Sequence, residues 1–307
     1  MFDLAIIGGG PAGAAAGVYA ARKRLRTVLI TETFGGQSTD SMGIENWIGW
    51  KNIPGAEFGK ILEEHLRHVA GESVEIKAHE LVEKVEKIEE GFRLSTNAGH
   101  SYEARTILVA TGSTRKKLEI PGAKEFENKG ISYCASCDGP LFSEQDVVVI
   151  GGGNAAFETA AQLLNYARSV TLLNRSNTLR ADEATIEQVL AHPKMKVVKG
   201  AKPKEIRGER FVTSLVYTDE ASAEHEIKVT GIFVEIGLLP TTWFVEGLIP
   251  LNKIGQIPVD PHTQRTTVDG IWAAGDSTDG LYHQNNIAAG DAVKALEDIY
   301  LYIHAGK

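Results

Sequence analysis

The stretch DLAIIGGGPAGAAAGVYAARKRLRTVLITE at residues 3–32 decides the fold, because DVVVIGGGNAAFETAAQLLNYARSVTLLNR at residues 146–175 repeats its pattern. Each stretch begins with an apolar run rich in β-branched residues, passes through three glycines into an Ala-rich helical segment, and ends in another apolar run. This order predicts a strand–turn–helix–strand unit, twice. The interval from Gly8 to Gly151 is far too long for a solenoid repeat, so the repetition predicts two nucleotide-binding domains.

The two glycine turns have the chemistry of a pyrophosphate site. The first glycine allows a tight turn, the second lets the backbone approach phosphate, and a small third residue lets helix and strand pack closely. The following helix directs its free N–H groups and its positive dipole end at the phosphates. One such motif also arises for packing reasons, but two in the same context favour nucleotide binding. The turn residues are Gly8, Gly10, Pro11, Ala12 and Gly13 in the first copy and Gly151, Gly153, Asn154, Ala155, Ala156 and Glu158 in the second.

The residues that follow each second strand differ between the copies. Glu32 can accept hydrogen bonds from both hydroxyls of an adenosine ribose. Asn174 has the matching place in the second copy, and Arg175 and Arg180 follow it. Without a carboxylate to repel it, a 2′-phosphate can bind these arginines. The alternative is a solvated loop, and the acids at 182–183 weaken the attraction for phosphate.

Length and composition limit the classes of protein. The chain has 307 residues, enough for about two domains, and a formal net charge of -8 without a basic run, so we expect no nucleic-acid partner. No segment approaches the ~20 apolar residues that span a bilayer. The first residues lack the basic stretch and cleavage pattern of a signal peptide. We therefore expect a cytoplasmic protein that does not bind membranes.

The chain contains two cysteines, Cys134 and Cys137, in a C-x-x-C spacing. Two cysteines make neither a secreted disulfide framework nor a four-ligand zinc site, and no His lies a short spacing away, so we expect no metal. In a cytosolic enzyme this spacing indicates a redox pair. We expect the pair at the start of a helix, whose dipole would lower a thiol pKa.

The apolar runs elsewhere suggest how the domains are connected. Strands that end near glycine are predicted at 106–112, 231–239 and 268–276, and an amphipathic helix at 287–303. We interpret residues 72–105 as a small β-meander.

The simplest arrangement is an α/β fold of two Rossmann-like, three-layer domains, each built on a parallel sheet. Residues 1–114 and 244–307 form one domain together with the meander, and residues 115–243, which contain the C-x-x-C pair, are inserted into it. Two short linkers, at residues 113–117 and 240–242, would permit one domain to rotate against the other.

Several segments together resemble the low-molecular-weight thioredoxin reductases, over essentially the whole chain. They are FGGQ at 34–37, IEN at 44–46, ATG at 110–112, CASCDGP at 134–140, GGGNAAFE at 151–158 and AAGD at 273–276. FGGQ…DSMGIENWI, CDGPLF and GIFVEIGLLP are similar to the flavoprotein subunit of alkyl hydroperoxide reductase, which has an additional thioredoxin-like region at its N-terminus. This chain begins at its first predicted strand, so we expect its acceptor to be a separate thioredoxin-like or glutaredoxin-like protein.

The resemblance implies a flavoenzyme and, since related enzymes usually are dimers, a homodimer. Residues 1–114 and 244–307 would bind FAD and residues 115–243 would bind NAD(P)H. Electrons would pass from NAD(P)H through the flavin to the Cys134–Cys137 disulfide. Nicotinamide and disulfide cannot share one face of the ring, so we expect the inserted domain to present them in turn.

Roles for the redox residues follow from the same resemblance. Cys137 would face the flavin, and Cys134 would be the more exposed thiolate that attacks the partner's disulfide. Asp138 would transfer a proton to the departing thiolate; the alternative is a helix N-cap, for which Asp is favoured.

The resemblance also assigns the residues around the flavin. The backbone N–H groups of residues 284–286 could face the pyrimidine end of the ring, where reduction places negative charge; the alternative is an Asn-rich surface loop. Asp276 would contact the ribityl or pyrophosphate part. The full set of expected flavin neighbours beyond the glycine turn is Gly36, Gln37, Asn46, Ala110, Thr111, Gly112, Gly275, Asp276, Gln284, Asn285 and Asn286.

The chain departs from the family in its nucleotide-phosphate segment. The usual His-Arg-Arg is Asn174-Arg175-Ser176 here, so one arginine of the expected pair is missing. Ser176 can donate one hydrogen bond, and we expect NADPH to be preferred over NADH.

Three other functions fit the same pattern. A ferredoxin or flavodoxin reductase would need no cysteines, and a redox sensor would bind FAD and nucleotide but turn over slowly. A reductase of a peroxiredoxin system, acting directly or through a glutaredoxin-like carrier, would use the same redox pair.

Overall fold

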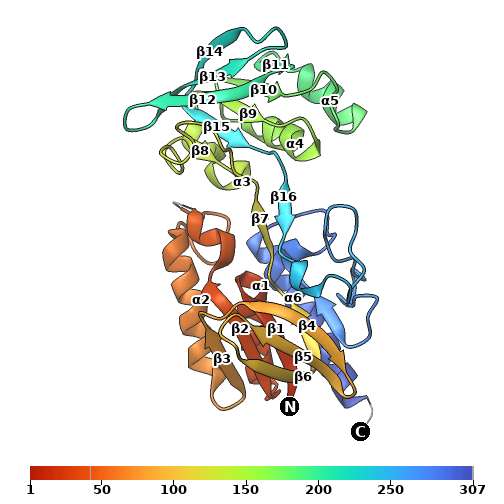
Figure 1. Cartoon of the computed structure of the whole chain (residues 1–307). Helices are drawn as coiled ribbons and strands as arrows, with labels where there is room; N and C mark the ends of the chain where they lie inside the picture. Colours follow the sequence, from red (N-terminus) through yellow and green to blue (C-terminus); the bar gives the residue numbers. More distant parts are fainter. Residues whose placement is uncertain (42, 306–307) are drawn as a thin grey trace. The chain divides into compact units, whose positions relative to one another are not determined.

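The computed structural model describes residues 1–41 and 43–305, which fall into two compact units (Figure 1). Unit 1 comprises Met1–Thr114 and Leu239–Lys307, and unit 2 comprises Arg115–Leu238. Unit 2 therefore ends at Leu238, before the boundary predicted after residue 243. Met42, inside the DSMGIENWI segment, and residues 306–307, at the end of the expected flavin domain, lie outside the described residues.

Unit 1 begins with β1, α1 and β2, which confirm the strand–turn–helix–strand order predicted for residues 3–32. Its elements are β1 (Phe2–Gly9), α1 (Pro11–Arg22), β2 (Thr27–Phe34), η1 (Gly36–Asp40), α2 (Gly55–Ala70), β3 (Val74–Ala78), β4 (Val82–Ile88), β5 (Gly91–Thr96), β6 (Ser101–Val109), η3 (Trp243–Val245), β17 (Ile271–Ala273), η4 (Gly275–Ser277) and α6 (Asn285–His304).

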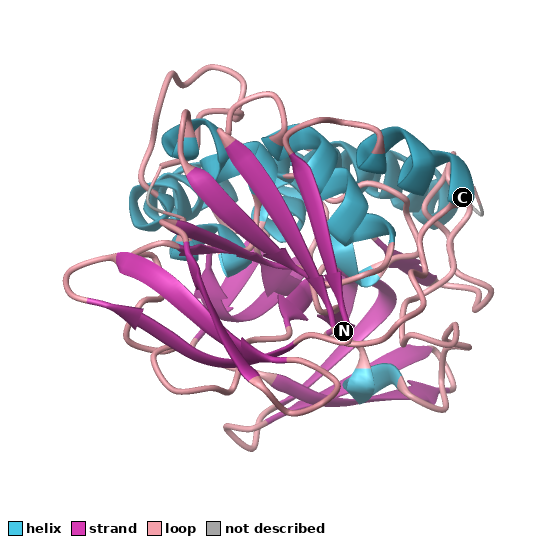
Figure 2. Ribbon diagram, turned by 90° about the horizontal axis from the view of Figure 1, so that it is seen from above, coloured by secondary structure: helices cyan, strands magenta, loops and turns pink. Residues whose placement is uncertain are grey.

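One sheet runs through unit 1, and its parallel part is covered on both faces. Its strand order is β3-β2-β1-β6-β5-β4, with β17 also paired to β6. Successive side chains of a strand point to opposite faces. Leu4 and Ile6 of β1 accordingly pack with α1, α2 and α6, while Ala5 and Ile7 pack with β4, β5 and residues 244–257. Figure 2 distinguishes the helices from the strands by colour. This is the predicted three-layer α/β architecture.

The prediction of a β-meander over residues 72–105 is partly wrong. β3 runs parallel to β2, with Val74 opposite Thr27, and so forms the edge of the parallel part of the sheet. β4, β5 and the first half of β6 are antiparallel, as a meander requires. β6 then continues into the apolar run at 106–109, where Ile107 pairs with Ile271. One long strand therefore belongs to both parts of the sheet.

Four predicted elements differ in extent from the observed ones. The strands predicted at 106–112, 231–239 and 268–276 end earlier, at Val109, Val234 and Ala273. Each is followed by a glycine with positive φ: Gly112 (65°), Gly237 (125°) and Gly275 (74°). Such a conformation interrupts the ladder of an extended strand. The last helix, α6, starts at Asn285, before the predicted residue 287; no helix among the described residues is both long and apolar enough to span a bilayer.

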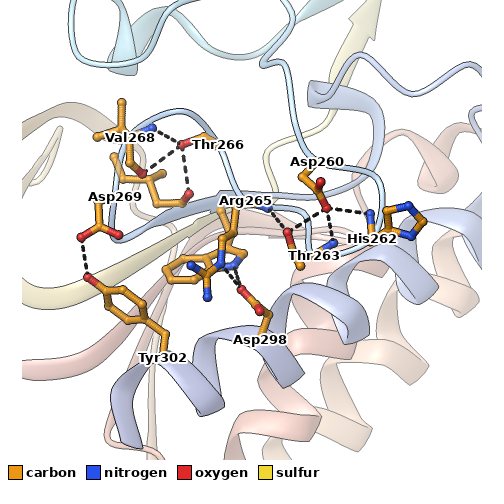
Figure 3. Close-up of polar contacts among 11 residues, drawn as sticks. Asp260, His262, Thr263, Arg265, Thr266, Val268, Asp269, Asp298 and Tyr302 are labelled. Carbon is orange, nitrogen blue, oxygen red and sulfur yellow. Dashed lines mark hydrogen bonds and ion pairs between the residues drawn. The ribbon is translucent and has the colours of Figure 1, made fainter. Parts of the chain in front are cut away.

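Polar contacts fix the segment before β17 against α6 (Figure 3). Asp298 of α6 accepts hydrogen bonds from Arg265 and from the indole N–H of Trp272. Tyr302 donates from its hydroxyl to Asp269 at 2.8 Å. These contacts join residues 265–272 to α6 and therefore fix the position of β17 against that helix.

Unit 2 repeats the nucleotide-binding pattern. Its elements are β8 (Ile131–Ser132), α3 (Ala135–Asp138), η2 (Gly139–Phe142), β9 (Asp146–Ile150), α4 (Asn154–Leu163), β10 (Ser169–Asn174), α5 (Glu183–Leu190), β11 (Met195–Lys199), β12 (Lys202–Gly208), β13 (Val212–Thr218), β14 (Glu224–Lys228) and β15 (Gly231–Val234). β9, α4 and β10 confirm the second predicted strand–turn–helix–strand unit.

Unit 2 also has three layers. Its parallel sheet has the order β11-β10-β9-β15-β8, and an antiparallel sheet has the order β12-β13-β14. Val147 and Val149 of β9 pack with α4 and α5, while Val148 and Ile150 pack with residues of β12 and β13. This antiparallel sheet was not predicted from the sequence.

The chain crosses between the units on two strands that pair with each other, β7 (Ser113–Arg115) and β16 (Leu238–Pro240). On either side of this pair, Thr241 donates its backbone N–H to Gly112 at 3.0 Å and Lys116 donates to Gly237 at 3.0 Å. The outgoing and returning segments therefore run side by side.

A buried carboxylate stabilises the antiparallel part of unit 1. Glu80 is 8% exposed and accepts hydrogen bonds from Thr96 at 3.0 Å and from Tyr102 at 3.1 Å, and its other close partner is His100 Nδ1 at 3.0 Å. Burial alone would raise the pKa of Glu80, but these hydrogen bonds lower it overall. We expect Glu80→Gln to lower the free energy of unfolding by about 1–2 kcal/mol at neutral pH, because a charged hydrogen-bond acceptor is lost.

The contribution of Glu80 to the free energy of unfolding should depend on pH in a definite direction. A carboxyl whose pKa is lower in the folded than in the unfolded protein stabilises the fold above the unfolded value of about 4.3, and this contribution disappears as the pH falls through the folded pKa. Chemical denaturation should show the difference between wild type and Glu80→Gln at neutral pH and little difference near pH 3. Glu83→Gln, at an exposed position of β4, is the control. An equal effect of the two substitutions at neutral pH would contradict the prediction.

Candidate functional site

The first glycine turn lies between β1 and α1, and packing requires two of its glycines. Gly8 has a φ of 114°, and a Cβ added there would lie 2.3 Å from the carbonyl oxygen of Ala110. A Cβ on Gly13 would lie 1.9 Å from the carbonyl oxygen of Gly8. At Gly10, by contrast, an added Cβ would meet no other part of the described chain within 4 Å, and φ −71°, ψ −172° suits any residue. This open backbone fits the close approach of a pyrophosphate.

The start of α1 has the further features of a phosphate site. Pro11 begins the helix, and no side chain caps it, so its first N–H groups remain available to a ligand. Ala12 is buried, and a Cβ on Gly275 would lie 3.5 Å from the Cβ of Ala12 and 3.2 Å from that of Ala288. Small residues therefore bring α1, η4 and α6 together at this turn.

Two other predicted segments lie beside the first glycine turn. Phe34 pairs with Gly9, and Gly35 donates its N–H to the Gly9 carbonyl at 2.9 Å, so the end of β2 that contains Glu32 runs along the turn. The Glu32 side chain is exposed and has no hydrogen-bond or ion-pair partner within residues 1–41 and 43–305, as a ribose-binding carboxylate requires.

The segment after β6 reaches the same edge of the sheet. Ala110 donates its N–H to the Ile7 carbonyl at 2.8 Å, which places it beside Gly8. Thr111 donates from its hydroxyl to the Thr241 carbonyl at 2.6 Å, and Gly112 has a positive φ of 65°. The predicted Ala-Thr-Gly segment therefore lines the carboxyl ends of the strands, where open α/β sheets bind ligands.

Hydrogen bonds bring the predicted flavin neighbours of residues 36–46 and 284–286 together. Ser38 donates from its hydroxyl to Asn285 Oδ1 at 2.8 Å. Asn46 donates from Nδ2 to Gln284 Oε1 at 3.1 Å, and Asn286 donates from Nδ2 to the Asn46 carbonyl at 2.8 Å. These contacts link parts of the sequence that are far apart.

The same residues start a helix. Asn285 and Asn286 are the first residues of α6, so the alternative of an Asn-rich surface loop is wrong for them. Gln284 is the N-cap residue and makes no side-chain capping bond, so the first N–H groups of α6 remain available. A 20-residue helix presents positive charge at this end, which suits a ring that becomes negative on reduction. Gln37 and Gly36 lie in η1, and Gln37 Nε2 donates to Ser113 at 3.1 Å.

Asp276 in η4 has a partner that the sequence analysis missed. His283 Nδ1 lies 3.4 Å from Asp276 Oδ1, and both side chains are about three-quarters buried, with exposed fractions of 22% and 26%. His283 was not among the predicted site residues, because nothing in the spacing of the two residues indicates their contact. The pair fixes the carboxylate at the start of the segment that leads to α6.

The second glycine turn lies between β9 and α4 and has the same geometry. Gly151 has a φ of 153°, and an added Cβ would lie 2.4 Å from the carbonyl oxygen of Glu235, while Ala156 is fully buried. At Gly153 an added Cβ would meet no atom of the described residues outside its chain neighbours, and φ −100°, ψ −175° suits any residue. Asn154, Ala155 and Glu158 follow on the exposed side of α4. This turn also fits a pyrophosphate.

The loop after β10 differs from the prediction at two of its residues. Asn174 is 5% exposed and donates from Nδ2 to the carbonyls of Ser176 at 2.7 Å and Thr178 at 2.9 Å. Ser176 donates its hydroxyl proton to the Thr178 carbonyl at 2.9 Å, so that proton is already used inside the loop. Asn174 and Ser176 therefore shape this loop.

The two arginines of this loop are available to a ligand. Arg175 and Arg180 are exposed, and neither guanidinium has an ion-pair partner in the part of the chain that the structure describes. The backbone of Arg180 is held against the second glycine turn, because its N–H donates to the Gly152 carbonyl at 2.7 Å. The backbone of Arg180 therefore lies beside the second glycine turn, and its side chain could reach a phosphate of bound adenosine.

Cys134 and Cys137 form a disulfide, with their Cα atoms 5.3 Å apart, and both side chains are half-buried. The predicted helix start is confirmed, since α3 begins at Ala135 with Cys134 as its N-cap, and Cys134 Sγ accepts the Cys137 N–H at 3.2 Å. α3 is a single turn that ends at Asp138. The 3-10 helix η2 (Gly139–Phe142) follows it directly.

Asp138 is the acidic residue that directly follows Cys137. Ser132 donates its hydroxyl proton to Asp138 Oδ2 at 2.6 Å and accepts the Cys134 N–H at 3.1 Å. Burial raises the pKa of Asp138, against the opposing effects of the Ser132 hydrogen bond and of the Arg115 charge. Asp138 is the N-cap residue of η2, but its side chain makes no capping bond there. Ser132 was not among the predicted site residues, and no pattern in the sequence indicates its role.

Comparisons with known proteins agree on one family. The profile of the pyridine nucleotide-disulphide oxidoreductases matches residues 2–292. A protein named NADH dehydrogenase from Bacillus subtilis is 39% identical over 98% of this chain and 58% of its own length, and an alkyl hydroperoxide reductase subunit from Pseudomonas aeruginosa is 40% identical over 96% and 57%. The chain thus spans less than two thirds of these curated relatives. The crystal structure of thioredoxin reductase from Streptococcus pyogenes matches with a TM-score of 0.90 and 34% identity over 99% of both chains.

Proposed function

Since the chain belongs to the pyridine nucleotide-disulphide oxidoreductase family, a family of flavin- and nicotinamide-dependent enzymes, we propose that it binds FAD in unit 1 and NAD(P)H in unit 2 and reduces a thioredoxin-like protein through Cys134 and Cys137. One observation supports this function above others. The disulfide lies within the unit of the second glycine turn, and a largely buried acid follows it directly. A ferredoxin or flavodoxin reductase would have no use for either.

The cofactor-binding roles follow from the geometry of unit 1. Gly10 and the start of α1 would hold the pyrophosphate of FAD, and Glu32 would hold its adenosine ribose. The free N–H groups at the start of α6 would face the pyrimidine end of the flavin ring. When bound, the flavin would accept a hydride from the nucleotide and pass two electrons to the disulfide.

The chain's own residues perform the exchange with the partner. After reduction, the Cys134 thiolate attacks one sulfur of the partner's disulfide, forms a mixed disulfide, and displaces the other partner sulfur as a thiolate. Cys137 then attacks Cys134, so the Cys134–Cys137 bond re-forms and the partner leaves as a dithiol. In the opposite direction, when the Cys134–Cys137 bond is reduced, Asp138 gives its proton to the departing thiolate.

An anaerobic titration of the yellow protein tests this function. If both flavin and disulfide accept electrons, the protein should take up two equivalents of nucleotide per flavin, because each group is a two-electron acceptor. The uptake of one equivalent would show that the disulfide takes no part. A colourless protein that binds no FAD would end the proposal.

NADPH is the nucleotide that we propose. The support is the two exposed arginines of the 174–180 loop, whose guanidinium groups have no ion-pair partner among the described residues. Arg175→Ala combined with Arg180→Ala should raise the KM for NADPH about tenfold or more, since a charge-assisted hydrogen bond to phosphate contributes about 1.5–3 kcal/mol. The KM for NADH should change little. Steady-state rates with each nucleotide measure this, and Arg210→Ala, at an exposed site of unit 2, is the control. Equal effects on both nucleotides would contradict a role in binding the 2′-phosphate.

A peroxiredoxin system is the second candidate for the acceptor. It is supported by the relatives that are named as alkyl hydroperoxide reductase subunits, since the chain is 40% identical to the one from Pseudomonas aeruginosa over 57% of that protein's length. Turnover with thioredoxin, and with a peroxiredoxin in the presence and absence of a glutaredoxin-like carrier, would distinguish the acceptors. A homodimer and a cytoplasmic location stay predictions.

A further inference from the structure

One serine of unit 2 contacts both the redox pair and the acid that follows it. Ser132 is the last residue of β8 and is 4% exposed, and it pairs with Phe233 of β15 in the parallel sheet. From this strand end its hydroxyl reaches the backbone of Cys134 and the side chain of Asp138. The proposed function uses Cys134 and Asp138 but gives Ser132 no role.

The Ser132 hydroxyl accepts one hydrogen bond and donates another. Its oxygen accepts the backbone N–H of Cys134 at 3.1 Å, and its proton is donated to Asp138 Oδ2 at 2.6 Å. A second acceptor, the Cys134 carbonyl, lies farther away at 3.4 Å. That carbonyl already accepts the N–H groups of Cys137 at 3.3 Å and of Asp138 at 3.0 Å. The hydroxyl proton of Ser132 is therefore directed to Asp138.

The backbone places this acid one helical turn after the first cysteine. The bond from the Asp138 N–H to the Cys134 carbonyl closes the single turn of α3. Residues four positions apart lie on the same side of a helical turn. Asp138 and Cys134 are therefore neighbours on this turn, and Ser132 connects the carboxyl of one to the backbone of the other.

The two oxygens of the Asp138 carboxyl have different surroundings. Oδ2 accepts the Ser132 proton, whereas Oδ1 accepts no hydrogen bond within residues 1–41 and 43–305. A neutral carboxyl has one O–H donor and one oxygen that only accepts. While Oδ2 accepts from Ser132, the proton of the neutral acid is on Oδ1. Ser132 thus determines which oxygen carries the proton.

The alternative role of Ser132 is to stabilise a local turn. A serine hydroxyl often accepts the N–H of the residue two positions later, and this contact needs only the serine oxygen. The bond to Asp138 is additional to the turn, and it is the shorter of the two. Burial opposes the ionisation of Asp138, while the bond from Ser132 favours it. The serine therefore affects the proton of the acid as well as the turn.

The charged surroundings of Asp138 are simple in the described part of the chain. The elements in most extensive contact with α3 are η2 and α4. η2 has no ionisable side chain, and the one ionisable residue of α4, Glu158, is exposed. The positive charge that acts on Asp138 is that of Arg115 in β7, and its effect on the pKa is smaller than that of the Ser132 bond.

We propose that Ser132 is a positioning residue for proton transfer at the redox pair: by holding Asp138 Oδ2 near the backbone of Cys134, it keeps the proton of the acid on Oδ1, where the departing sulfur can take it. The inference rests on the proposed function in taking the Cys134–Cys137 disulfide as redox-active. In the step concerned, an external thiolate attacks one sulfur of the pair and forms a new S–S bond with it. The Cys134–Cys137 bond breaks, its electron pair goes to the other sulfur, and the Asp138 proton moves to that sulfur.

The test uses the oxidised full-length chain, with dithiothreitol as the external thiol. The rate of disulfide reduction is measured by acid quenching, alkylation and mass spectrometry between about pH 4.5 and pH 9, and divided by the concentration of dithiothreitol thiolate. In the wild type this corrected rate should fall as the pH rises through the pKa of Asp138, because the ionised acid has no proton to give. Asp138→Asn should remove the fall.

Ser132→Ala should change this pH profile in two ways. The fall should move to higher pH by about one unit, because the lost hydrogen bond stabilised the ionised carboxylate. Below the fall the corrected rate should be about tenfold lower, because the carboxyl is no longer held in place. Ser132→Thr keeps the hydroxyl and should retain the wild-type profile.

The chain offers a matched control in the same helical turn. Ser136 of α3 is exposed and donates its hydroxyl to Gln162 at 3.0 Å. Ser136→Ala therefore removes a serine hydroxyl close to the redox pair without touching Asp138. It should leave both the position of the fall and the rate below it unchanged.

Thermal unfolding shows which variants are folded before their profiles are compared. A fall of Ser132→Ala at or below the wild-type pH, or an unchanged rate below it, would overturn the proposal and leave Ser132 with the turn alone. If Ser132→Ala is unfolded, Ser132→Thr and Ser132→Val test the same shift, since they share a shape and differ in the hydroxyl. The expected shift in a protein that takes up no FAD would sink the proposed function and leave this inference standing.

Discussion

Cys137→Ser is expected to lower turnover with a thioredoxin-like acceptor by more than about a thousandfold, a loss typical of removing an essential nucleophile. Without the second sulfur the Cys134–Cys137 bond cannot form, so no electrons reach the acceptor. The reduction of the flavin by nucleotide should remain fast, because that step uses no cysteine. Rapid-mixing absorbance of the flavin and steady-state turnover with the acceptor measure the two steps separately.

The control for this prediction lies between the two cysteines. Ser136 is exposed and donates its hydroxyl to Gln162 at 3.0 Å, so Ser136→Ala should leave both steps unchanged. In the Cys137→Ser variant the anaerobic titration should end at one equivalent of nucleotide per flavin. Full turnover with its natural acceptor in the absence of Cys137 would instead support a ferredoxin or flavodoxin reductase.

The second large effect is expected from valine at the open glycines. Gly10→Val should give a folded protein that binds no FAD, and Gly153→Val should give a yellow protein that NAD(P)H no longer reduces. Both positions have extended backbone angles, and an added Cβ meets only open space in the described chain, so neither fold should be strained. The side chain would instead occupy the space of the pyrophosphate, which should cost at least about a hundredfold in affinity.

The pair of variants also tests which unit binds which cofactor. Circular dichroism and thermal unfolding check that the proteins are folded, and flavin absorbance and nucleotide titration check the ligands. Gly13→Ala is the informative contrast, since its Cβ would lie 1.9 Å from the Gly8 carbonyl and should lower stability itself. A colourless Gly153→Val protein would show that the cofactors are assigned to the wrong units.

The parts of the fold that could be predicted from sequence are those determined by local chemistry. A strand, a turn of small residues and a helix must be adjacent in the chain, so the glycine turns and the C-x-x-C pair can be recognised without a structure. The flavin-side segments were predicted in a different way, because their residues match a family pattern. The structure then adds that residues 37–46 and 284–286 touch through specific side-chain bonds.

What escaped prediction depends on contacts between distant residues. Ser132 donates a hydrogen bond to Asp138, His283 lies beside Asp276, and Arg115 lies beside Glu235. None of these pairs has a spacing in the sequence that indicates contact. The double use of β6 was missed for a related reason: the run at 106–109 reads as a strand by itself, whereas pairing with β5 extends it back to Ser101.

The pairing of β7 with β16 gives the inserted segment neighbouring start and end points. Thr114 and Leu239, the residues just outside Arg115–Leu238, are linked by a hydrogen bond of 3.4 Å from the threonine hydroxyl to the leucine carbonyl. A segment with adjoining ends can be excised and its flanks rejoined by a few residues, as domain insertions generally allow. Arg115–Leu238 should therefore be exchangeable between homologues as one gene fragment. We expect the recipient protein to acquire both the nucleotide preference and the redox-active cysteines of the donor.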